Sequence, residues 1–232
     1  MSVIAVVGTG RVGIGFAEAA VAAGHRVILA NSRGPETLTE LVSSLGTSAA
    51  ADTVEGAAAQ ADMVLLAVPL HSYDSLPASA LNGRIVMDAG NYYTDWSGHI
   101  VELDEETTTT SERLQEMFPL ARVVKAFNSI YAEDIALDAR PGGGERRALP
   151  VASDDDVAKQ AVIDLIESIG YDVVDAGALR EGWRFQRDTP AYVVPLNTSE
   201  LVTALRQARR YRDMAADNVA TERSHRMPGT DD

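Results

Sequence analysis

The feature of this chain most able to do chemistry is a glycine-rich turn near its start. The apolar residues 2–7 lead directly into the pattern Gly-x-Gly-x-x-Gly, whose six residues are Gly8, Thr9, Gly10, Arg11, Val12 and Gly13. In such a turn the first glycine permits the sharp bend, the second lets the backbone approach a pyrophosphate, and the third allows helix and strand to pack closely. The N–H groups that begin the following helix can bind phosphate oxygens. The pattern predicts a dinucleotide-binding site; a glycine turn without a ligand is the alternative.

The residues that end the second apolar run indicate which dinucleotide is bound. This run covers residues 26–30 and is followed by Asn31, Ser32 and Arg33. Sites for NAD(H) usually carry an acidic residue here, which binds the ribose 2′-hydroxyl. This strand end has no acid, whereas serine and arginine can both bind a phosphate. We therefore expect NADP(H), with these three residues near its 2′-phosphate; an ordinary solvated arginine in a loop is the alternative for Arg33.

The elements that must position these residues alternate along the first half of the chain. Further apolar runs typical of buried strands lie at residues 47–51, 63–68, 84–88 and 122–127. Helical segments are expected at residues 36–44, 53–61, 72–81 and 111–118, whereas residues 92–110 are expected to be polar and irregular. This alternation predicts an α/β fold, a Rossmann-type doubly wound parallel sheet with a small C-terminal region.

We expect two regions, an NADP-binding domain at residues 1–128 and a smaller C-terminal region at residues 129–232. Strands near residues 148–152 and 171–175 flank a helix at residues 154–169, and they are expected to extend the first sheet.

The end of the chain carries a last expected helix, at residues 198–219. Its four arginines are expected to form a solvated face, and they are Arg206, Arg209, Arg210 and Arg212. Residues 225–232 are expected to be a frayed tail.

The binding site is expected at the carboxyl ends of the strands, where the strand order reverses. The residues expected there, besides the glycine turn, are Val68, Pro69, His71, Ala89, Asn91 and Asn128. Val68 and Pro69 would give the nicotinamide an apolar wall. Asn91 and Asn128 could hydrogen-bond to its amide or to the hydride acceptor, with turn formation as the alternative for each.

The candidates for a catalytic side chain are few. His71 has a pKa in the range useful for donating a proton, and a surface position that caps a helix is its alternative. Asn128 is the other candidate. Lys125 is unusual inside a strand, because lysine is seldom buried unpaired. It is expected either at an edge or facing the cofactor phosphates.

Composition excludes several classes of protein. The formal charge of −14 and the pI of about 4.6 argue against nucleic acid and against an anionic membrane surface as partners. The chain has no cysteine, so it offers neither disulfides nor thiolate chemistry. Four scattered histidines do not indicate a transition-metal site. We find no run of eighteen apolar residues and no signal peptide, and expect a cytoplasmic protein.

A family resemblance becomes visible in these segments. The turn with the following Gly24-His25 and residues 31–33 resembles the NADP oxidoreductases that depend on the deazaflavin coenzyme F420. Residues 150–156 and 175–179 resemble the C-terminal part of the same family. Residues 123–130 also resemble the cytosolic reductase domain of the six-transmembrane metalloreductases, which use NADPH and a flavin. The resemblance implies hydride transfer between NADP(H) and a deazaflavin, or FMN or FAD, as the second substrate.

The identity of the hydride acceptor stays open at this point. The deazaflavin has an anionic tail, which a patch formed by Arg146, Arg147, Arg180, Arg184 and Arg187 could bind, or these arginines are scattered. Residues 91–96 and 183–186 are bulky and match no part of the family pattern; they could stack on a ring, fill a smaller pocket or seal a homodimer. The alternatives are an NADPH-dependent reductase of a small imine or carbonyl, with His71, Tyr92 or Tyr93 as proton donor, and a non-enzymatic NADPH-binding sensor.

Overall fold

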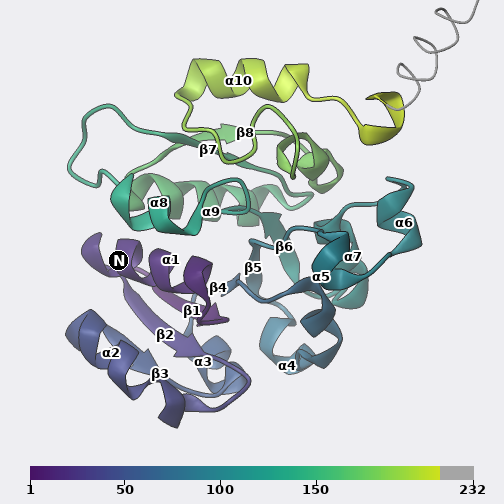
Figure 1. The fold of residues 1–232 in the computed structure, drawn as a ribbon. Helices are drawn as coiled ribbons and strands as arrows, with labels where there is room; N and C mark the ends of the chain where they lie inside the picture. The colour runs from purple at the N-terminus through teal and green to yellow at the C-terminus, as the bar shows by residue number, and fades with distance from the viewer. Residues whose placement is uncertain (215–232) are drawn as a thin grey trace, which may run out of the picture.

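A six-stranded parallel sheet forms the centre of the computed structural model, which describes residues 1–214 (Figure 1). Its strands are β1 (Val3–Val7), β2 (Arg26–Ala30), β3 (Ala49–Ala51), β4 (Met63–Leu66), β5 (Ile85–Asp88) and β6 (Arg122–Lys125). The spatial order is β3-β2-β1-β4-β5-β6, so the order reverses between β1 and β4. This arrangement confirms the predicted Rossmann-type doubly wound fold.

Helices cover both faces of the sheet because its central strands β1, β2 and β4 are buried on both sides. In β1, Ile4 and Val6 pack into one apolar cluster, with α1 (Arg11–Ala22), α8 (Ala132–Leu137) and α9 (Asp156–Ile169). Ala5 and Val7 pack into a second cluster on the opposite face. The helices of that second face are α3 (Val54–Gln60), α4 (Ala78–Leu81) and α7 (Thr110–Met117).

The remaining elements are short or lie outside these two layers. They are α2 (Thr39–Leu45), α5 (Thr94–Ser97), α6 (Val101–Asp104), α10 (Thr198–Gln207) and the 3-10 helices η1 (Pro35–Leu38), η2 (Gly46–Ser48), η3 (Leu70–Ser75) and η4 (Leu179–Phe185). Residues 72–81, expected as one helix, are divided between η3 and α4. Pro77 explains the break, since Leu76 before it is extended.

The expectation that residues 92–110 are irregular is wrong, since this segment contains the two short helices α5 and α6. Tyr92 orders it: its hydroxyl donates to Asp104 Oδ1 at 2.7 Å and accepts from the Ile100 N–H at 2.9 Å.

The last helix is also shorter than expected, because α10 ends at Gln207 and Ala208 is extended. Residues 215–219 of that helix and the expected tail at residues 225–232 lie outside the described residues.

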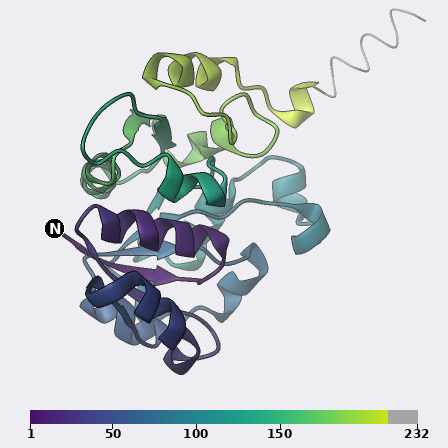
Figure 2. The same cartoon turned by 60° about the vertical axis from the view of Figure 1, so that its left-hand side comes forward.

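A second, two-stranded parallel sheet is formed by β7 (Ala148–Val151) and β8 (Asp172–Asp175), with α10 packed over it (Figures 1 and 2). The expectation that these strands extend the first sheet is therefore wrong. A single antiparallel bridge between Lys125 and Ala152 connects the two sheets. Ala152 donates to the Lys125 carbonyl, but Pro150, whose nitrogen would face the same side, has no N–H to continue the ladder.

Within residues 1–214, no helix is long and apolar enough to cross a membrane. The same residues contain no group of three or more His, Cys, Asp and Glu side chains placed to hold a metal ion.

Candidate functional site

The glycine turn lies at the point where the strand order reverses, between the carboxyl ends of β1 and β4. Gly8 has a φ of 102°, a conformation that L side chains rarely adopt. Its N–H donates to the Ala30 carbonyl at 2.9 Å. A Cβ at Gly8 would lie 2.3 Å from the Ala67 carbonyl oxygen, so the turn presses directly against the end of β4.

Gly10 and Gly13 differ in the space around them. A Cβ built at Gly13 would lie only 1.9 Å from the Gly8 carbonyl oxygen, whereas a Cβ built at Gly10 would meet no atom within 4 Å. Gly10 is the N-cap of α1, and no side chain caps this helix end. The backbone at Gly10 is thus open to a ligand, and the first N–H groups of α1 point toward it. These features fit the pyrophosphate of a dinucleotide.

The other three residues of the turn take different positions. Thr9 and Val12 are half-buried, whereas Arg11 is exposed and pairs with Glu133 at 3.0 Å.

The loop after β2 is held by its own asparagine. Asn31 Oδ1 accepts from the Arg33 N–H at 2.9 Å, and its Nδ2 donates to Thr37 Oγ1 at 3.0 Å. The asparagine therefore shapes the loop, while Ser32 and Arg33 are exposed. Residues 31–33 include no acid, although the Glu36 carboxylate lies beside Gly34. A serine hydroxyl and a guanidinium at the strand end fit a 2′-phosphate better than a 2′-hydroxyl.

The residues after β4 lie beside the turn. Val68 Cγ1 would lie 2.8 Å from a Cβ at Gly8, which brings this half-buried valine to the turn as expected for an apolar wall. Pro69 and His71 are exposed, and His71 lies on η3. Ala89, just after β5, is buried.

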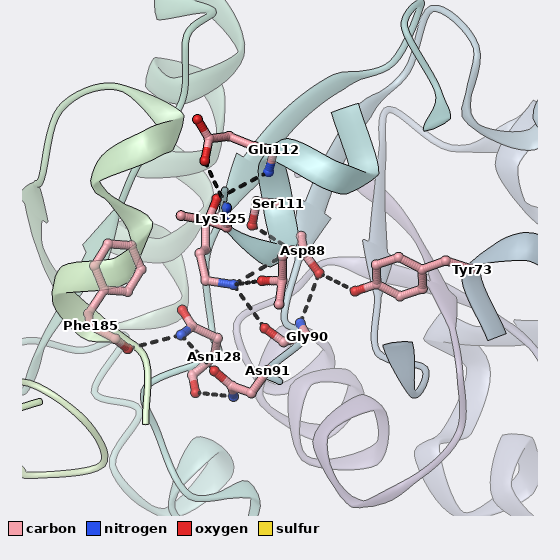
Figure 3. A network of polar contacts seen from close by, with 11 residues as sticks. Tyr73, Asp88, Gly90, Asn91, Ser111, Glu112, Lys125, Asn128 and Phe185 are labelled. Atoms are coloured by element: carbon pink, nitrogen blue, oxygen red, sulfur yellow. Dashed lines mark hydrogen bonds and ion pairs between the residues drawn. The ribbon is translucent and has the colours of Figure 1, made fainter. Parts of the chain in front are cut away.

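Asn91 and Asn128 meet at the carboxyl ends of β5 and β6 (Figure 3). Asn91 Nδ2 donates to the Asn128 carbonyl at 2.8 Å, and Asn128 Nδ2 donates to Asn91 Oδ1 at 3.2 Å and to the Phe185 carbonyl at 3.0 Å. Asn128 Oδ1 is buried and has no hydrogen-bond partner within the described chain. A buried acceptor without a donor is costly, and the carboxamide N–H of a nicotinamide would satisfy it.

A buried carboxylate lies behind these asparagines. Asp88, the last residue of β5, has no exposed surface. It accepts hydrogen bonds from the hydroxyls of Tyr73 and Ser111, each at 2.6 Å, and from the Gly90 N–H at 2.9 Å. Burial, with Asp88 as the second cause, raises the pKa of Tyr73 well above its usual value, so this phenol stays protonated and donates.

Lys125, at the end of β6, completes this network (Figure 3). Lys125 lies on β6, an edge strand of the six-stranded sheet, as one of the two expectations states, but only 1% of it is exposed. The other expectation, that it faces the cofactor phosphates, is wrong, because its side chain is turned into a buried network. Its Nζ donates to the Gly90 carbonyl at 2.8 Å and to Thr110 Oγ1 at 3.0 Å, and lies 3.6 Å from Asp88 Oδ2. An opposite charge and two acceptors offset the cost of burying this ammonium.

A cavity of about 180 Å³ lies beyond this network, between the segment after β5, η4 and the residues after α10. Its lining includes Tyr92, Thr110, Trp183, Arg187, Arg210 and Tyr211. The bulky segments at residues 91–96 and 183–186, which the sequence leaves unplaced, thus meet at one cavity. The lining also includes the acids Asp104 and Glu106. Its rings suit a flat ligand, and its guanidinium groups can pair with negative charge on that ligand.

The arginines of this region do not form the single patch that the sequence suggests. The guanidinium of Arg187 lies 5.3 Å from the Tyr93 ring centre, whereas Arg146 and Arg147 line a different cavity near residues 138–147. Arg210, expected on a solvated helix face, instead lies 4.6 Å from the Trp183 ring centre and donates to the Glu106 carbonyl at 3.0 Å.

Sequence reasoning did not single out Asp88, Thr110 or Tyr211, and it did not bring the other residues around the cavity together. Asp88 carried a signal, because a carboxylate at the end of a buried strand needs partners. Lys125 inside β6 was the second signal. A lysine and an aspartate on two buried strands together indicate a buried ion pair. Trp183 and Arg210 gave no comparable signal, since their contact joins segments that are distant in the sequence.

Known proteins similar to this chain agree with the geometry. The family described as coenzyme F420-dependent NADP oxidoreductase matches residues 3–92. The structure of protein SMa0349 from Sinorhizobium meliloti is 32% identical with a TM-score of 0.73, and the match covers 85% of this chain and 96% of that one. A proposed F420-dependent NADP reductase from Arthrobacter is 30% identical with a TM-score of 0.63, covering 75% of this chain and 84% of that one.

A curated relative extends the comparison. Metalloreductase STEAP3 from Rattus norvegicus is 29% identical over 198 residues, which are 83% of this chain and 38% of that protein. The chain therefore spans about two fifths of the length of this relative. Taken with the glycine turn and the acid-free end of β2, the family match and the Arthrobacter structure decide the family. The chain belongs to the coenzyme F420-dependent NADP oxidoreductases and is an NADP-dependent oxidoreductase.

Proposed function

We propose that this protein transfers hydride between NADP(H) and a deazaflavin or flavin. NADPH lies along residues 8–13, with its pyrophosphate at Gly10 and the start of α1. Ser32 and Arg33 bind the 2′-phosphate. The open space at Gly10 and the exposed guanidinium at an acid-free strand end support this placement.

The observation that carries the acceptor assignment is the cavity lined by aromatic rings and arginines. Tyr92 lies one residue beyond Asn91, so the cavity begins beside the strand ends where the nicotinamide is expected. Trp183 and Tyr211 offer ring surfaces, and Arg187 and Arg210 offer positive charge beside the acids Asp104 and Glu106. A flat ring system with an anionic tail matches both properties.

The side chains of the protein bind, orient and exclude water, while the hydride chemistry is supplied by the bound nicotinamide. Val68 forms an apolar wall for the nicotinamide. Asn128 Oδ1, which lacks a partner, accepts from its carboxamide, and Asn91 fixes Asn128 in place. A fixed ring orientation lowers the entropic part of the barrier to transfer.

A second candidate function is favoured by the size of the cavity. Its volume of about 180 Å³ lies below the roughly 300–1,000 Å³ of sites that enclose a drug-sized ligand. A tricyclic acceptor would therefore place only part of its ring system in the cavity, whereas a small imine or carbonyl compound would fit inside it.

The test is to mix the purified protein with NADPH and, separately, the deazaflavin coenzyme, FMN, FAD, a cyclic imine or no acceptor. Absorbance at the nicotinamide band follows the reaction, and NADH replaces NADPH in a parallel set. The proposal expects fast oxidation of NADPH, but not NADH, with the deazaflavin or a flavin. Oxidation with the imine alone would favour the second candidate. Tight NADPH binding with no oxidation would contradict both and leave an NADPH-binding sensor.

A further inference from the structure

Lys125 occupies a position that cofactor binding alone does not explain. It is one of only two lysines in the sequence, the other being Lys159. Its side chain is enclosed by β5, β6, α7 and η4, and a Cβ at Gly182 of η4 would lie 2.8 Å from Lys125 Cδ. A fully buried ammonium is expensive and is often found at functional sites.

Thr110 connects this ammonium with the cavity. Its Oγ1 accepts a hydrogen bond from Lys125 Nζ at 3.0 Å, and the same threonine lines the cavity. Because the hydroxyl uses an oxygen lone pair for the lysine, its own proton remains available as a donor. Within residues 1–214, no acceptor for that proton is present.

We propose that Thr110 gives a proton to the hydride acceptor bound in the cavity and that Lys125 replaces this proton. The proposal rests on the proposed function, because it requires an acceptor ring in this cavity. It assigns the proton source that hydride transfer needs, since a reduced ring system gains a hydride and a proton.

The proposed step conserves electrons and protons. A hydride with its two electrons reaches a carbon of the acceptor, and the O–H bond of Thr110 breaks as its proton moves to the nitrogen or oxygen conjugated with that carbon. Lys125 Nζ gives one proton to Oγ1, so Thr110 is again a neutral hydroxyl and Lys125 becomes a neutral amine. Solvent returns a proton to Nζ after the product leaves.

The surroundings of Lys125 allow it to lose this proton. Asp88 is the titratable group in contact with Nζ, and it is held by three other donors, from Tyr73, Ser111 and Gly90. The carboxylate therefore keeps its hydrogen bonds when the ammonium becomes an amine. Burial lowers the pKa of Lys125, and Asp88 opposes this shift. From η4 the residue against Lys125 is uncharged Gly182, and from α7 the contact is uncharged Thr110.

Two substitutions at Thr110 form a matched pair. Thr110→Val removes the proposed donor and keeps its shape, while Thr110→Ser keeps the hydroxyl. We expect kcat of Thr110→Val with the deazaflavin coenzyme to fall about 100-fold, as general acids contribute, with the NADPH Kd unchanged. Thr110→Ser should recover most of kcat.

Lys125→Arg tests the replacement of the proton, because arginine donates a hydrogen bond but is not deprotonated in proteins. Its kcat should fall while its NADPH Kd stays within twofold of the wild type.

A measurement without turnover is nuclear magnetic resonance of the lysine-labelled protein. Two lysine signals are expected, and the one lost in Lys125→Arg belongs to Lys125. The pKa read from its titration should lie below the ordinary lysine value of about 10.4. The inference is overturned if Lys125 keeps its proton to that pH or above, or if folded Thr110→Val has the kcat of the wild type. If the wild-type protein oxidises NADPH with none of the acceptors, the proposed function is overturned, and this inference with it.

Discussion

The substitution Gly10→Ala should weaken NADPH binding without lowering the stability of the fold. Gly10 has a φ of −79°, which any residue adopts, and a Cβ there meets no atom within 4 Å. Replacing glycine where the backbone suits other residues stabilises a fold by about 0.4–1 kcal/mol through the unfolded chain. Gly10→Ala should therefore be at least as stable as the wild type in urea unfolding without cofactor.

The same methyl group fills the space through which a pyrophosphate approaches the backbone. Loss of one hydrogen bond to a charged group costs about 1.5–3 kcal/mol, which corresponds to a roughly 10- to 150-fold rise in Kd. Calorimetric titration with NADPH measures this rise directly. Gly13→Ala is the matched variant: its Cβ would lie 1.9 Å from the Gly8 carbonyl oxygen, so it should lose about 1–3 kcal/mol of stability, as overpacking does. A stable Gly10→Ala variant that binds NADPH as tightly as the wild type would refute the placement of the pyrophosphate at Gly10.

Three further predictions follow from single residues. Arg33→Ala should raise the Kd for NADPH about tenfold or more and leave that for NADH nearly unchanged, because the guanidinium is assigned to the 2′-phosphate; equal effects on both cofactors in calorimetry would remove that role. Burial lowers the pKa of His25, so its neutral form stabilises the fold above the unfolded value of about 6.5 and this stability is lost as pH falls. The free energy of unfolding should decrease between pH 7.5 and 5 by at most about 1.4 kcal/mol per pH unit from this residue. His25 Nε2 lies 2.9 Å from Ser168 Oγ, and His25→Gln, whose amide can bond to the same hydroxyl, should flatten the decrease; an unchanged slope would exclude His25 as the cause. Asp155 caps α9 and forms two hydrogen bonds with Arg122, so Asp155→Ala should lose about 1–2 kcal/mol in urea unfolding at pH 7, and a loss below ~0.3 kcal/mol would show that the cap contributes little.

The parts of the fold set by local sequence could be predicted. The glycine spacing, the apolar strands and the strand end at Asn31 each depend on a few adjacent residues, and the turn and sheet agree with them. Pro150 shows how one residue alters a prediction that is locally sound: the strand forms, but without an N–H it cannot extend the first sheet.

The candidate site was predictable only on its cofactor side. The acceptor side is assembled from segments far apart in the chain, such as Trp183 with Arg210 and Lys125 with Thr110. Such contacts depend on how η4, α7 and the residues after α10 pack together, and helix or strand periodicity carries no information about that packing. The buried position of Lys125 likewise becomes clear only when Asp88 is seen on the neighbouring strand.

The measurement that tests the central claim most directly is the transfer of deuterium. The wild-type protein is mixed with the deazaflavin coenzyme and NADPH that carries one deuterium at nicotinamide C4. The two forms of NADPH, labelled on one or the other face of the ring, are used in turn. The mass of the reduced coenzyme is measured by mass spectrometry. Direct hydride transfer predicts that one labelled form places a deuterium on a carbon of the reduced ring, where it does not exchange with water. A reduced product without deuterium from either form, or NADPH that remains unoxidised with this coenzyme and also with FMN and FAD, would contradict the account.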